Sequence, residues 1–114
     1  MSISLAVGVD SFDRGRDSIL VYTRLSLFHQ DYELFDALKA AAAPLPVAVG
    51  WYEDEGLRYR RDDQYGEPLT FLTAHQFLRI WNTRKAARLD DWDESCIAFI
   101  RAMRPDRKLV LFWK

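Results

Sequence analysis

Acidic residues gather near the start of the chain, where several carboxylates in a short loop could bind a hard cation such as calcium. Asp10, Asp13 and Asp17 provide the carboxylates. Their spacing departs from the calcium-loop pattern, and no glutamate follows at the required distance. Arg14 and Arg16 lie between them and would repel a cation. We therefore expect this segment to be an ordinary loop between two strands, with no metal site.

Histidine and cysteine are the residue types that most often act as general bases, nucleophiles or zinc ligands. The chain has two histidines, His29 and His75, and neither has another histidine or cysteine within four residues. Cys96 lies on the apolar side of an expected helix, where a thiol behaves as a small hydrophobic group. The five glycines do not cluster into a phosphate-binding loop. The sequence thus predicts no catalytic residue, no metal and no cofactor.

A small enzyme of unassigned chemistry stays open as an alternative. It would require Asp10 or Asp13, one of the two histidines and an arginine to meet in a single cleft.

The segment from Trp51 to Tyr65 has the composition of a protein-binding surface. Aromatic and arginine side chains contribute most of the binding energy in protein interfaces, and here arginines alternate with a tyrosine. The residues that we predict to contact a partner are Trp51, Arg58, Tyr59, Arg60, Arg61 and Tyr65. The alternative is a solvated hairpin whose acidic and basic side chains pair with one another. Five acidic residues at positions 53–55 and 62–63 disfavour a third interpretation, binding to nucleic acid.

Two hairpins and a helix are expected in the first half of the chain. Alternating apolar residues indicate strands at 3–9 and 19–25, and again at 47–51 and 57–61 with Gly56 in the turn. Between these hairpins, good helix formers follow Asp31, a candidate N-cap, and continue to Ala43. Pro44 and Pro46 are expected to end that helix.

Two helices and a strand are expected in the second half. Thr73 and Gln76 match a capping box, so a helix should begin near Ala74. Acidic residues at positions 90, 91, 93 and 94 fit the first turn of another helix, with Asp90 or Asp91 as its cap. In that helix the expected buried stripe is Trp92, Cys96, Phe99 and Met103.

The last strand, 108–113, is apolar on both faces, so we expect it to lie centrally in the sheet. The prediction is one α+β domain spanning 1–114, with a largely antiparallel sheet of about five strands and three helices. The expected order is β-β-α-β-β-α-α-β.

The composition agrees with a single cytoplasmic domain. The chain has 114 residues, a formal charge of −1 and 49% hydrophobic residues, which excludes a disordered tail and a strongly basic nucleic-acid binder. It has no apolar run of the ~18 residues that span a bilayer, and its start does not resemble a signal peptide. A single cysteine suits a reducing compartment. Sixteen aromatic residues exceed what a small core needs, so we expect some of them at the surface.

Three stretches carry short motifs: a D-Y-x-L-F helix start in 30–38, an L-T-x-x-Q helix entry in 69–77, and a terminal R-x-L-V-L-F-W strand in 106–113. In this order they resemble a group of small uncharacterised proteins found in phages, prophages and bacterial genomes. The G-C-D-I-H and P-R-G-x-P motifs of that group are absent here, so no metal or catalytic role is carried over. The resemblance implies an origin in a mobile genetic element.

These observations favour a non-enzymatic factor that binds another protein. We expect a phage- or prophage-encoded inhibitor of a host or defence complex, comparable in role to an anti-CRISPR protein. A small enzyme and a nucleic-acid-binding module remain alternatives. A homodimer that pairs through a sheet edge also stays open.

Overall fold

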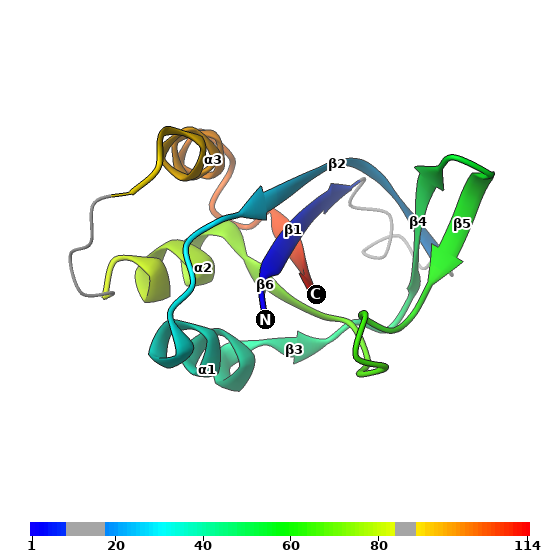
Figure 1. Cartoon of the computed structure of the whole chain (residues 1–114), viewed down its shortest axis with the longest axis horizontal. Coiled ribbons are helices and arrows are strands. Elements are labelled where there is room, and N and C mark those ends of the chain that lie inside the picture. The colour runs from blue at the N-terminus through cyan, green and yellow to red at the C-terminus, as the bar shows by residue number, and fades with distance from the viewer. Residues whose placement is uncertain (9–17, 84–88) are drawn as a thin grey trace.

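The computed structural model describes residues 1–8, 18–83 and 89–114, with no side-chain detail for residues 8 and 18–22. It is an α+β structure in which three helices pack on a mostly antiparallel sheet (Figure 1). The elements are β1 (Ile3–Gly8), β2 (Ser18–Leu27), α1 (Tyr32–Ala41), β3 (Ala43–Pro44), β4 (Ala48–Glu53), β5 (Gly56–Arg60), β6 (Thr70–Thr73), α2 (Ala74–Trp81), α3 (Asp91–Arg101) and β7 (Lys108–Trp113). The predicted fold class and the order of the eight predicted elements are confirmed, and the short strands β3 and β6 are additional. The aspartates at positions 10, 13 and 17 lie outside the described residues.

The strands follow the order β3-β6-β7-β1-β2-β4-β5 across the sheet. Both predicted hairpins are present, since β1 pairs antiparallel with β2 and β4 with β5. The terminal strand β7 lies between β6 and β1, as its apolar composition predicts. β2 is long and pairs with two neighbouring strands. Its start pairs in parallel with β4 over three residues, and the rest pairs with β1.

The helix starts follow the predicted caps. The Asp31 side chain accepts hydrogen bonds from the backbone N–H groups of Glu33 and Leu34. At α2, Thr73 and Gln76 form the complete capping box. Helix α1 ends at Ala41, two residues earlier than expected, because a residue that precedes proline disfavours helical geometry. Ala43 and Pro44 instead form β3, which pairs with β6.

The predicted buried stripe of α3 is wrong at Trp92 and Phe99, whereas Cys96 is buried and Met103, just beyond the helix, is partly buried against the core. Its cap is Asp90, but Trp92 and Phe99 are about half exposed, at 46% and 48%. The residues that face the core are Asp93, Cys96, Ile97 and Ile100. That face is rotated by one position relative to the predicted stripe, and only Cys96 is buried in both.

The sheet separates two hydrophobic cores. Helices α1, α2 and α3 cover one face and contribute to the larger core, whereas the smaller core on the other face contains Val49 and Trp51 of β4. Strand β7 contributes side chains to both cores. Leu111 and Trp113 face the helices, and Phe112 faces the β4–β5 side. Within the described residues, no helix is long and apolar enough to cross a bilayer.

Candidate partner-binding site

The β4–β5 hairpin contains most of the residues predicted to bind a partner. A two-residue turn, Asp54–Glu55, connects the strands, so that Glu53 pairs with Gly56. Gly56 has a φ of +110°, a region that favours glycine because it has no Cβ. This short turn fixes the register along the whole hairpin and places alternate side chains on opposite faces.

The inner face of the hairpin buries Trp51, which is only 3% exposed. Its ring packs edge-on against Phe112 with centroids 5.3 Å apart. The guanidinium groups of Arg24 and Arg60 lie 4.9 and 5.8 Å from the ring centroid, and the indole N–H donates a 2.8 Å hydrogen bond to Glu53. The prediction that Trp51 is a partner-contacting side chain is therefore wrong. Strand alternation directs its ring into the smaller core, where it cannot meet a partner.

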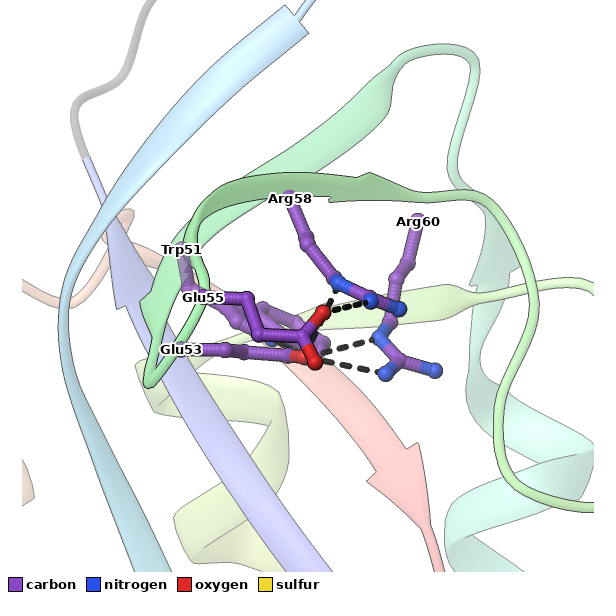
Figure 2. Close-up of polar contacts among 5 residues, drawn as sticks. All are labelled: Trp51, Glu53, Glu55, Arg58 and Arg60. Atoms are coloured by element: carbon purple, nitrogen blue, oxygen red, sulfur yellow. Dashed lines mark hydrogen bonds and ion pairs between the residues drawn. The ribbon is translucent and has the colours of Figure 1, made fainter.

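Glu53 is the centre of an ionic cluster at the edge of this inner face (Figure 2). Arg60 donates two hydrogen bonds to Oε1 of Glu53, at 2.9 and 3.1 Å. The Nε of Arg58 lies 3.4 Å from the second oxygen of Glu53, and its Nη2 pairs with Glu55 at 2.7 Å. Both arginines thus pair within the hairpin, as the solvated-hairpin alternative expects for these two residues. The hydrogen bond from Trp51, followed by those from Arg60, holds the pKa of Glu53 below its usual value.

Replacing Glu53 with glutamine is expected to destabilise the protein at neutral pH and to have a smaller effect in acid. Because the pKa of Glu53 is lower in the folded chain, its charge stabilises the fold fully above the ordinary value of 4.5. That contribution is lost as the pH falls through the lowered pKa. Urea unfolding of both proteins between about pH 7 and about pH 3 measures the difference.

Asp54→Asn is the matched control, since the structure gives the Asp54 side chain no partner among the described residues. The pH dependence of its stability should follow that of the unchanged protein. A difference between Glu53→Gln and the unchanged protein that stays constant with pH would contradict the role of the Glu53 charge.

The outer face of the hairpin carries the exposed aromatic surface. Tyr52, Leu57 and Tyr59 are 76%, 40% and 55% exposed, and Tyr52 lies directly opposite Leu57 in the register. We call these three residues the outer hairpin face. Two predicted residues, Arg61 and Tyr65, are also exposed, in the segment that follows β5.

Tyr52 and Leu57 belong to this surface although composition alone did not select them. Recognising Asp54–Glu55 as a two-residue turn would have identified both residues. Such a turn places Tyr52 opposite Leu57 and on the same face as Tyr59.

The loop after β5 is held by a buried carboxylate. Asp63 is 8% exposed, and its Oδ1 accepts hydrogen bonds from the backbone N–H groups of Tyr65 and Glu67, at 2.8 and 3.1 Å. Gln64 N–H also bonds to the carbonyl of Trp113 in β7. These contacts fix the backbone at Tyr65, so its half-exposed ring projects from an ordered loop.

The described residues bring no catalytic group together. His29 packs edge-on against Trp81, and neither histidine side chain bonds to a described carboxylate. Burial raises the pKa of the Cys96 thiol, and the nearby Asp93 charge adds to this, which is the opposite of what a nucleophile needs. No group of three metal-ligating side chains occurs in the part of the chain that the structure describes.

The geometry therefore defines an α+β protein that presents an aromatic hairpin surface. Comparison of the chain with models of known families, with curated proteins and with solved structures finds no match.

Proposed function

We propose that this protein is a non-enzymatic, cytoplasmic factor that acts by binding another protein through the outer hairpin face. The observation that carries the proposal is the exposure of Tyr52, Leu57 and Tyr59 together on one face of a hairpin whose opposite face is packed into a core. Arg61 and Tyr65 extend the surface beyond β5.

The hairpin supports such a role because its contact residues are positioned in advance. Tyrosine adds a large contact area with few rotatable bonds, so little side-chain entropy is lost on binding. Trp51 and the Glu53 cluster fix the hairpin from its inner side. A rigid element that exposes two tyrosines and a leucine has the composition of an interface centre.

We further propose that the partner is a host or defence complex and that the protein is a phage- or prophage-encoded inhibitor, comparable in role to an anti-CRISPR protein. The support for this is the resemblance carried by the stretches 30–38, 69–77 and 106–113. An inhibitor needs no catalytic centre of its own, since occupying a surface is sufficient.

The test is quantitative affinity purification from bacterial lysates with the tagged protein and with Tyr52→Ala. One protein should be enriched by the unchanged chain, and truncating a central interface tyrosine should weaken its binding about 30-fold. Tyr32→Ala is the matched control, because Tyr32 of α1 is exposed to the same extent, 76%, and lies outside the hairpin. It should retain the enrichment.

Two results would overturn the proposal. One is equal enrichment by Tyr52→Ala and the unchanged chain for every captured protein. The other is elution of the protein alone and monomeric from every lysate. A nucleic-acid partner would instead appear as binding that falls steeply with salt, and a dimer through the β5 edge as twice the chain mass in light scattering.

A further inference from the structure

A cleft of about 720 Å³ opens on the helical side of the sheet, where α1, β3 and the 62–68 loop meet the end of β7. Its volume falls in the range of small-molecule sites. The apolar part of its lining comes from Met1, Pro44, Pro68 and Trp113. It is separate from the outer hairpin face, although Tyr65 borders it.

One wall of the cleft is rigid. The Asp63 carboxylate accepts two backbone hydrogen bonds from its own loop, and the loop is tied to β7 through Gln64 and Trp113. Pro44 and Thr70 on the neighbouring wall are paired between β3 and β6. A wall that is fixed before binding lowers the entropy lost when a ligand enters.

The other wall carries a cation. The Nζ of Lys39, in the last turn of α1, lies 4.8 Å from the centroid of the Trp113 ring and 3.2 Å from Sδ of Met1. Within residues 1–8, 18–83 and 89–114, the structure gives this ammonium group no carboxylate partner. A cation above an indole ring at an apolar cleft can pair with an anionic group while the rest of the ligand lies on the apolar lining.

We propose that this cleft binds an amphipathic organic anion, a ligand with an apolar body and one carboxylate or sulfonate group. The anionic group pairs with Lys39, and the apolar body packs against Pro44, Pro68 and Trp113. Asp63 and Glu67 line the cleft as well. Their charges oppose any anion in the cleft and oppose a doubly charged one more strongly, so the site favours monoanions over dianions.

The test uses two fluorescent probes of similar shape, 8-anilinonaphthalene-1-sulfonate and its uncharged relative N-phenyl-1-naphthylamine. The sulfonate probe should bind one-to-one and saturably. Lys39→Gln should weaken it about tenfold, because a charge-assisted hydrogen bond is removed, and should change the affinity of the uncharged probe less than about twofold. Glu67→Gln should tighten binding of the sulfonate probe.

Two further variants locate the site. Arg79→Gln removes an exposed cation of α2 outside the cleft and should leave both affinities unchanged. Thr70→Trp fills the cleft and should abolish binding of both probes, provided that near-ultraviolet circular dichroism shows a folded chain. Lys39 is exposed, so its replacement tests the proposal even if Thr70→Trp fails to fold.

The proposal is overturned if Lys39→Gln weakens both probes equally or neither, or if the sulfonate probe binds without saturating. It is also overturned if a folded Thr70→Trp binds as tightly as the unchanged chain. None of these results bears on the outer hairpin face, because Tyr52→Ala leaves the cleft intact.

Discussion

Replacing Asp93 with alanine is expected to lower the free energy of unfolding by about 3 kcal/mol. Asp93 is 1% exposed, and its two carboxylate oxygens accept hydrogen bonds from the backbone N–H groups of Phe28 and His29, at 2.7 and 2.9 Å. Alanine leaves both donors without this acceptor, and a hydrogen bond to a charged group contributes about 1.5–3 kcal/mol. Guanidinium unfolding followed by circular dichroism measures the loss.

The position of Asp93 suits a short, charged side chain. It lies in the first turn of α3, where the helix dipole favours a negative charge, and it connects that turn to the segment between β2 and α1. Glu94→Gln is the control, because Glu94 is exposed in the same turn. It should change stability by less than about 0.5 kcal/mol. Equal losses for the two variants would mean that helix charge alone, and not this connection, accounts for the effect.

Replacing Trp51 with alanine is expected to cost about 3–5 kcal/mol. The change removes the ring contact with Phe112, the contacts of two guanidinium groups with the indole ring, and the hydrogen bond to Glu53. It also leaves a cavity in the smaller core, which has few residues to fill it. Thermal and denaturant unfolding both report this loss.

Tyr52→Ala is the matched control for Trp51→Ala, since it truncates the next residue of the same strand. Tyr52 is 76% exposed, so its loss should change stability by less than about 1 kcal/mol. The pair therefore separates folding from binding, because Trp51 stabilises the hairpin and Tyr52 is proposed to contact the partner. Similar stabilities for the two variants would contradict the burial of Trp51.

Local signals in the sequence predicted much of this fold. The caps at Asp31, Thr73 and Asp90 each depend on a few neighbouring residues, so they could be predicted without knowledge of the tertiary structure. The expected hairpin turn is present but lies at Asp54–Glu55, and Gly56, which we expected in the turn, is the first residue of β5. The central place of β7 followed from the same logic, because a strand that is apolar on both faces must be covered on both sides.

Other features depend on long-range packing and could not be read locally. The parallel pairing of β2 with β4 joins segments about thirty residues apart. In α3, Asp93 is buried although a charged side chain is expected to face solvent. Two backbone N–H groups more than sixty residues away in the chain donate hydrogen bonds to its carboxylate. Once Asp93 faces inward, Trp92 and Phe99 must turn toward solvent.

Long-range packing also decides which of the predicted contact residues are buried and which are exposed. Composition does not tell which aromatic side chains of a hairpin are buried and which are exposed. Alternation along β4 does, because it directs Trp51 inward and Tyr52 outward. Only a fixed register distinguishes them. The two-residue turn sets this register, and the composition of the segment does not identify that turn.

The division of β7 between two cores has a consequence for how the sequence can change. Leu111 and Phe112 are covalent neighbours, yet they contribute to different layers, while Trp51 and Phe112 are distant in the chain and share one. Substitutions should therefore compensate one another within a layer and act independently between layers. The hairpin layer can thus diverge or be redesigned while the helical layer keeps its packing.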